Sequence, residues 1–537
     1  MNNDLTQAGI SRRGFVAGLG TLSVLAGLGL AGCGGSDSGS GSASGSSTGN
    51  VAYRDELQVA MPSSPDGLDP HTTSSLVTVD IACNIMEPLF GLDSKCEPQP
   101  VLAKSYKVSD DGLVYTIELR EGIVFHNGKE LGPDDVVASM NRWLKVNDRA
   151  ASLLPDAQFA ASGDHEVTCT LTAPATDFLT ILGSHSQYPA IIPVEVIDAA
   201  GDTGIADYIG TGAYKLVEWK QDQYIHLTRY DDYRAAGGKA SGYTGKVSAP
   251  TKDIFYQFVT EGSTRVSGFE TGEYDIADEI PTENFHDFDG NDDVKLHTHA
   301  AGVLTAFFNM NKGIFADEAI RKCAFMAIDC KAAALAAYGE EELFTIDPNL
   351  GNPENDQWAT DAGKKYFNQA DPKAAKKALA KTSYAGGTVR LLTTPDYKEM
   401  YNATVALQEQ LEKAGFTAEV ESYEFATFMD IRSSKADQWD LFVASTNYKP
   451  IPAQSLSVSK GFYGLSDEKA LTLVGETRTA EDQKAATKTW AECQERLYEI
   501  AVVEPLCHYV AITGTQADVE GFELLDGAII WNAKRPE

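Results

Sequence analysis

The 537-residue sequence is poor in basic residues and lacks the usual spacings of metal-binding histidine and cysteine. Lysine and arginine total 44 against 77 aspartates and glutamates, a formal net charge of -33 at pH 7. A field of that sign argues against nucleic acid and anionic lipid surfaces as partners and favours solubility. Neither C-x-x-C nor H-x-x-x-H occurs, and His297 and His299 have no third ligand nearby in the sequence. We therefore expect no metal site and no cofactor.

Signatures of catalysis are also missing. Within residues 51–537, the hydrolase elbow G-x-S-x-G, the metalloprotease motif H-E-x-x-H and the glycine spacings that bind phosphate do not occur. The acidic pair Asp134-Asp135 follows Pro133, which is the composition of a helix start, with two acids facing the positive end of the helix dipole. We expect a protein that is not an enzyme.

Cysteine is scarce, and its number does not allow complete pairing. Of the eight cysteines, Cys33 lies in an N-terminal leader, and the remaining seven leave at least one unpaired within the chain. Cys323 and Cys330 fall in a helical pattern over 317–331, where a rise of about 1.5 Å per residue separates them by roughly 10 Å. A disulfide needs less than about 7 Å, so we expect no bond between them.

The N-terminus reads as an export signal followed by a lipid-attachment site. Residues 11–16 (SRRGFV) place a twin arginine before a modest apolar run that ends at Ala31, so residues 1–32 are interpreted as a twin-arginine signal peptide. The segment Leu30-Ala31-Gly32-Cys33 resembles the bacterial lipobox, which implies acylation of Cys33. Several acyl chains, at about 0.8 kcal/mol per buried CH₂, would anchor the protein stably.

A linker follows, and no second membrane segment is evident. Residues 33–50 are mostly glycine and serine and contain almost no apolar side chains, the composition of a flexible coil with a reach of roughly 20–25 Å. No later apolar run reaches the ~18 residues needed to span a bilayer. We expect the body, from Val51 onward, to be soluble and tethered to the extracytoplasmic face of the bacterial cell membrane.

The body alternates strand and helix patterns. Residues 113–119 alternate apolar and polar side chains, and Asn127-Gly128 is the strongest two-residue hairpin signal. A helix with one apolar stripe is predicted from Pro133 onward, and another over 401–414, closed by Gly415. The class is therefore α/β.

Motifs spread over the chain resemble the signature of family 5 solute-binding proteins, the extracytoplasmic receptors of peptide, nickel and related ABC importers. They occur in the family's order and cover essentially the whole mature chain. The matching segments are 68–71 (LDPH), 87–90 (EPLF), 109–120 (SDDGLVYTIELR), 125–128 (FHNG), 134–139 (DDVVAS), 209–214 (IGTGAY), 308–311 (FNMN) and 317–331 (DEAIRKCAFMAIDCK). Independently of the resemblance, we interpret Gly210 and Gly212 as residues of tight turns, where the backbone needs positive φ and therefore favours glycine.

The resemblance implies a two-lobed periplasmic-binding-protein clamshell of type II, cluster C, with a small inserted domain. Lobe I would comprise 51–91, 205–300 and 505–537, the inserted domain II 92–204, and lobe III 301–504. The protein would be a monomer that captures a peptide or peptide-like solute between lobes I and III and delivers it to the permease subunits of an ABC transporter. Hinge motion would close the lobes.

The resemblance also indicates candidate ligand contacts. Ser74, Ser75 and Leu76 correspond to a ligand-contacting loop, and Phe307 and Phe308 correspond to positions beside a peptide backbone. Because Phe307 and Phe308 are adjacent in a predicted strand, we expect at least one of them in the core.

The position of the aspartate that binds the ligand's ammonium group in peptide-binding relatives is not acidic here. In the matching segment, the candidate ligand contacts are Thr446, Asn447, Tyr448 and Lys449, and one of the last three replaces the aspartate. A buried ammonium without a counter-charge costs several kcal/mol, so another group must bind it or the ligand differs. Lys449 is either a partner for a ligand carboxylate or a solvated loop residue. The alternative to a peptide is an anionic molecule, a sugar or a metal chelate, bound for import or for sensing.

Overall fold

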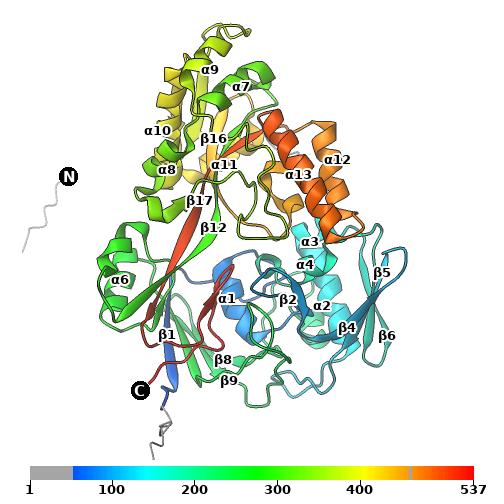
Figure 1. Cartoon of the computed structure of the whole chain (residues 1–537). Coiled ribbons are helices and arrows are strands. Elements are labelled where there is room, and N and C mark those ends of the chain that lie inside the picture. Colours follow the sequence, from blue (N-terminus) through cyan, green and yellow to red (C-terminus); the bar gives the residue numbers. More distant parts are fainter. Residues whose placement is uncertain (1–51, 459–462) are drawn as a thin grey trace, which may run out of the picture. The chain divides into compact units, whose positions relative to one another are not determined.

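The computed structural model describes residues 52–458 and 463–537, and residues 51–537 form one compact unit. Its main element is an eleven-stranded mixed sheet (Figure 1). Ten strands follow one path, and β13 (Phe344–Thr345) pairs with β17 beside it. In spatial order the ten are β15 (Thr417–Ser422), β14 (Thr388–Thr393), β16 (Leu441–Asn447), β12 (Val294–Phe308), β17 (Val503–Gln516), β11 (Ile276–Ala277), β1 (Glu56–Met61), β10 (Asp253–Phe258), β9 (Tyr224–Arg229) and β8 (Tyr214–Lys220).

Three smaller sheets accompany it. A four-stranded antiparallel sheet has the order β4 (Ala103–Val108), β5 (Val114–Leu119), β7 (Glu166–Thr170) and β6 (Gln158–Gly163). The two hairpins are β2 (Phe90–Leu92) with β3 (Pro98–Pro100), and β18 (Glu523–Leu524) with β19 (Ala528–Ile529).

Helices surround these sheets. The α-helices are α1 (Leu76–Ile85), α2 (Pro133–Val146), α3 (Asp148–Leu153), α4 (Phe178–Leu182), α5 (Val194–Ala200), α6 (Gly262–Glu270), α7 (Glu318–Ala327), α8 (Cys330–Tyr338), α9 (Pro372–Leu379), α10 (Lys398–Lys413), α11 (Phe425–Ser434), α12 (Glu468–Arg478) and α13 (Gln483–Glu499). Short 3₁₀ turns occupy His185–Gln187, Thr282–Phe288, Ile314–Ala316, Glu341–Leu343, Pro452–Gln454 and Leu456–Val458.

The two longest strands, β12 and β17, join the two halves of the main sheet. They pair antiparallel along almost their whole length, with irregularities at Ala300/Gly302 and Leu304/Thr305. In Figure 1 they run from the region of α6 and β1 to the region of α7, α10 and α11. The predicted boundaries at 300 and 505 fall within these strands, and the division into three domain segments stays a prediction.

Local sequence patterns between residues 113 and 146 predicted the correct elements. β5 alternates buried and partly exposed residues as predicted, and Gly128 has a φ of 86° in the turn that joins Val124 to Glu130. Helix α2 begins with Pro133 at its first position, and the Asp135 carboxylate accepts a hydrogen bond from the Gly132 amide at 3.0 Å. The acidic pair therefore starts a helix, as expected.

The predicted single helix over 317–331 is wrong. It divides into α7 and α8, because the Asp329 side chain accepts a hydrogen bond from the Ala332 amide and starts a new helix. Cys323 and Cys330 thus lie on separate helices, and both are unpaired, as are the other five cysteines of the described residues.

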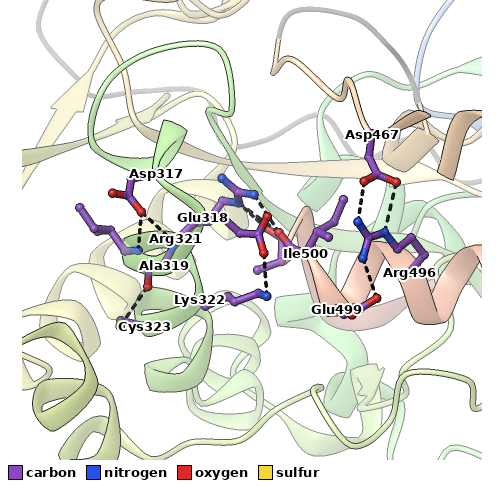
Figure 2. A network of polar contacts seen from close by, with 12 residues as sticks. Asp317, Glu318, Ala319, Arg321, Lys322, Cys323, Asp467, Arg496, Glu499 and Ile500 are labelled. Carbon is purple, nitrogen blue, oxygen red and sulfur yellow. Dashed lines mark hydrogen bonds and ion pairs between the residues drawn. The ribbon is translucent and has the colours of Figure 1, made fainter. Parts of the chain in front are cut away.

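Buried and partly buried arginines hold this part of the fold together (Figure 2). Arg321 on α7 donates to the main-chain carbonyl of Ile500 at 2.8 Å, beyond the end of α13. Arg496 on α13 forms a two-point ion pair with Asp467, at 2.7 and 3.2 Å, and so fastens α12 to α13. Such geometry fixes the orientation of both partners.

The glycines of the 209–214 motif do not have positive φ, which corrects the expectation for Gly210 and Gly212. Both lie so close to the end of α1 that a Cβ would overlap main-chain oxygens, of Ile85 at Gly210 and of Asn84 at Gly212. Close approach of two backbones requires glycine here.

Candidate ligand-binding site

A cavity of about 1130 Å³ lies where the two halves of the main sheet meet. Its walls come from segments far apart in the sequence: the start of α1, the residues after β11, the middle of β12 and β17, the end of β16, α11, the loop around residues 350–358, and the β18–β19 turn. This volume is slightly above the usual range of small-molecule pockets, about 300–1,000 Å³, and suits a ligand larger than a single amino acid.

Most of the residues predicted from the sequence lie on this cavity. Ser74, Leu76, Thr446, Asn447, Tyr448 and Lys449 line it. Ser75 does not line it; Ser75 is exposed at the N-cap of α1, and its amide donates a hydrogen bond to Thr73 Oγ1 at 3.0 Å.

Phe307 and Phe308 are core residues, which corrects their assignment as ligand contacts. They are 1% and 0% exposed, and neither lines the cavity. Phe307 stacks on Phe442 with ring centroids 4.9 Å apart, and Phe308 packs edge-on against Phe315 at 5.1 Å. Both side chains are buried because β12 is an inner strand, between β16 and β17, with its two faces covered.

The segment that replaces the family's aspartate is tied to β17. Tyr509 donates a hydrogen bond to Asn447 Oδ1 at 3.1 Å. His508 Nε2 faces the main-chain carbonyl of Asp347 at 3.2 Å, so Nε2 donates and Nδ1 accepts the Tyr448 hydroxyl at 2.7 Å. Burial lowers the pKa of His508, which keeps the imidazole neutral for this arrangement.

Lys449 is a half-buried cation without an ion pair among the described residues. Burial, reinforced by the nearby Arg149 charge, lowers its pKa to about 8, and the Asp526 carboxylate opposes this shift. A ligand carboxylate would restore the full positive charge.

Besides Glu399 of α10, four carboxylates line the cavity that sequence reasoning missed. They are Asp80 of α1, Asp278 and Glu279 after β11, and Asp526 of the β18–β19 turn. Burial raises the pKa of all four carboxyl groups. The pKa of Asp278 rises to about 7, because the negative charges of Glu279 and Asp80 add to the effect of burial. No motif marked them, since they are separated by up to 446 positions in the sequence.

Aromatic side chains form part of the remaining wall. Tyr397 packs edge-on against Phe425 with centroids 4.8 Å apart, and Trp490 of α13 lies at 1% exposure. Trp358 is 7% exposed, and its indole Nε1 has no hydrogen-bond partner among the described residues. The same holds for His299 Nδ1.

Neither a metal nor a membrane span is indicated by the residues that the structure describes. They contain no cluster of three or more histidine, cysteine or acidic side chains placed to hold a metal ion. Nor do they contain a helix of the length and hydropathy that crossing a bilayer requires.

Comparison with known proteins places the chain in a family. The profile of bacterial extracellular solute-binding proteins, family 5, matches residues 97–464. The probable peptide ABC transporter periplasmic-binding protein y4tO of Sinorhizobium fredii is 25% identical over 87% of this chain and 91% of its own. The glutathione-binding protein GsiB of Escherichia coli K12 is 26% identical over 68% and 69%.

The fold is shared with solved structures. The binding protein AgaA of Agrobacterium tumefaciens, in complex with agropinic acid, superposes with a TM-score of 0.72 and 23% identity, covering 90% of this chain and 99% of that one. The chain therefore belongs to the family 5 bacterial extracellular solute-binding proteins and has the two-lobed type II periplasmic-binding-protein fold.

Proposed function

We propose that this protein is the solute receptor of an ABC importer, which captures a peptide or peptide-like molecule in the 1130 Å³ cavity and delivers it to the permease. The observation that carries the proposal is a cavity of this size between the two lobes of a solute-binding fold. The names of the relatives support it, since y4tO is described as a probable peptide-binding protein and GsiB as glutathione-binding.

Capture would use closure of the lobes about β12 and β17. These strands join the two halves of the sheet, and their irregular pairing at Gly302 lies beside the cavity. Hinge closure around a ligand is the usual motion of such binding proteins. No bond needs to be made or broken, so the role is binding and not catalysis.

The N-terminal residues would keep the receptor at the membrane. Cys33 and the linker 33–50 lie outside the described residues, and their roles as lipid attachment site and tether remain proposals. Tethering raises the effective concentration of receptor at the transporter without a new contact. A Cys33→Ala variant is expected to leave the membrane fraction; if it still sediments with membranes after export, acylation of Cys33 is wrong.

A non-peptide ligand is the second candidate. Lys449 without an ion pair and the adjacent Arg149 favour an anionic group in the ligand. AgaA, which shares the fold, is bound to agropinic acid. This alternative would retain the fold and the receptor role while changing the solute.

Native mass spectrometry of gently purified residues 51–537 distinguishes the two candidates, because this segment is one compact unit. A series of bound masses that differ by amino-acid residues would support peptide capture. A single mass, or retention of a carboxylate-rich or chelate ligand alone, would refute it. Deletion of the gene, followed by uptake assays with labelled tripeptides, tests delivery to a permease.

A further inference from the structure

Besides the strands β12 and β17, a contact between the start of α4 and the end of α12 joins the two halves of the molecule. Helix α4 belongs to residues 52–293, on one side of these strands, and α12 belongs to residues 309–502, on the other. In Figure 1, α12 and α13 lie next to α3 and α4, away from β12 and β17.

Four hydrogen bonds form this contact. The Thr176 amide donates to the main-chain oxygen of Arg478 at 2.8 Å, and the Thr176 hydroxyl donates to the main-chain oxygen of Ala480 at 2.5 Å. The Arg478 guanidinium donates to both carboxylate oxygens of Asp177, at 2.8 and 3.2 Å. Charge-assisted bonds of this two-point kind are stronger than neutral ones and fix the orientation of both partners. We call Thr176, Asp177, Arg478 and Ala480 the α4–α12 contact.

The ion pair Asp177–Arg478 differs from the others in where its partners lie. Within the described part of the chain, it is the one ion pair that joins residues 52–293 to residues 309–502. The Asp177 side chain is 2% exposed and that of Arg478 20%, so salt screens this pair less than a surface pair. Apolar packing accompanies it, since Leu179 of α4 and Leu473 of α12 belong to one buried cluster.

The cavity lies between the α4–α12 contact and the strands that join the halves. Its wall includes the middle of β12 and β17, and also Ser186, just beyond α4, and Trp490 of α13, which packs against α12. Opening of the lobes by a hinge motion about β12 and β17 would therefore separate the α4–α12 contact, because this contact lies across the cavity from the hinge.

We propose that the α4–α12 contact is a latch, which holds the lobes closed over the bound solute and slows its release. Opening exchanges the four hydrogen bonds for bonds to water, so removal of the Asp177–Arg478 pair should shift the equilibrium towards the open state. The role in solute release rests on the proposed function, whereas closure by the latch can be measured without a solute.

Hydrogen exchange in ligand-free residues 51–537, which form one compact unit, tests the latch. The Thr176 amide exchanges when its bond to Arg478 opens, whereas the Ile181 amide, which donates to the main-chain oxygen of Asp177 at 2.9 Å, exchanges when α4 itself unfolds. Arg478→Met should speed exchange at Thr176 about tenfold, the usual contribution of hydrogen bonds to a charged group, and leave Ile181 unchanged. Small-angle X-ray scattering should show a larger radius of gyration.

A matched control and two further variants separate the latch from general effects. Arg496→Met also removes a two-point ion pair, but its partner Asp467 lies in the same half, so exchange at Thr176 and the radius of gyration should not change. Adding Asp177→Asn to Arg478→Met should have no further effect, because both changes remove one pair. Thr176→Val removes the hydroxyl bond alone and should speed exchange by a smaller factor, which keeps the test available if Arg478→Met does not fold.

Release of a pool of tripeptides after dilution, followed by native mass spectrometry, tests the effect on the solute. It should be about tenfold faster from Arg478→Met than from the wild type, in proportion to the opening. Faster opening with unchanged tripeptide release would overturn the role of the latch in retention.

The remaining outcomes distinguish the latch from the proposed function. Unchanged Thr176 exchange and an unchanged radius of gyration in Arg478→Met would overturn the latch, whether or not tripeptides bind. Equal acceleration at Thr176 and Ile181 without a larger radius of gyration would also overturn it, because local unfolding of α4 would then explain the exchange. A wild type that retains no tripeptide would overturn peptide capture, while the ligand-free measurements would still decide whether the latch exists.

Discussion

Glu504 on β17 is expected to make the stability of this protein depend on pH. Its side chain is 0% exposed; one oxygen accepts a hydrogen bond from the Asn368 amide at 2.8 Å, and the other has no partner among the described residues. Burial raises its pKa from 4.5 to about 8. At 1.36 kcal/mol per unit, that change corresponds to roughly 4–5 kcal/mol of folding free energy.

The sign follows from proton linkage. Between pH 4.5 and about 8 the folded state holds a proton on Glu504 that the unfolded state has released. The stabilisation is therefore fully present below pH 4.5 and is lost as the pH rises through about 8. Glu504→Gln removes this titration while keeping the acceptor for Asn368. The free energy of unfolding of the variant, minus that of the wild type, should rise by about 4–5 kcal/mol between pH 4.5 and 8.5.

Urea unfolding followed by tryptophan fluorescence at pH 4.5, 6.5 and 8.5 measures this difference. Glu476→Gln on α12 is the control, because Glu476 is exposed and its substitution also removes one carboxylate from the highly acidic chain. The control should follow the wild type at every pH. A difference between Glu504→Gln and wild type that stays constant within about 1 kcal/mol over this range would refute the reasoning.

Two other predictions concern a buried ion pair and a glycine. In the structure, the buried Asp69 carboxylate lies 2.6 Å from the Arg142 guanidinium. Arg142→Met would leave this carboxylate without its cation and should lower the free energy of unfolding, measured in urea titrations, by about 3–5 kcal/mol. Gly210→Ala should lower the melting temperature in calorimetry, since its Cβ would overlap a main-chain oxygen of α1, whereas Gly204→Ala, in open space, should not.

Each of these predictions has an outcome that would contradict it. An unfolding free energy unchanged by Arg142→Met would mean that the pair contributes nothing net, as some buried pairs do. Equal melting temperatures for the two alanine variants would contradict the close contact at Gly210.

Local chemistry in the sequence determined many elements and the family. The alternation in β5, the Asn127-Gly128 turn and the start of α2 at Pro133 were predictable because strand period, turn chemistry and helix capping act within a few residues. The resemblance to family 5 rested on short motifs in order, and the family profile now matches residues 97–464. Residues 446–449, predicted as ligand contacts, line the cavity, and their role in binding stays a proposal.

Tertiary structure alone decided what depends on neighbours distant in the sequence. Burial of Phe307 and Phe308 follows from the inner position of β12, and the need for glycine at Gly210 follows from the approach of α1. Asp80, Asp278, Glu279 and Asp526 line one cavity because β1 pairs with β11, β11 pairs with β17, and the β18–β19 turn packs against α1 at Asp80. A sequence pattern records what each residue prefers locally, whereas the charge that faces a cavity depends on which distant segments the fold brings together.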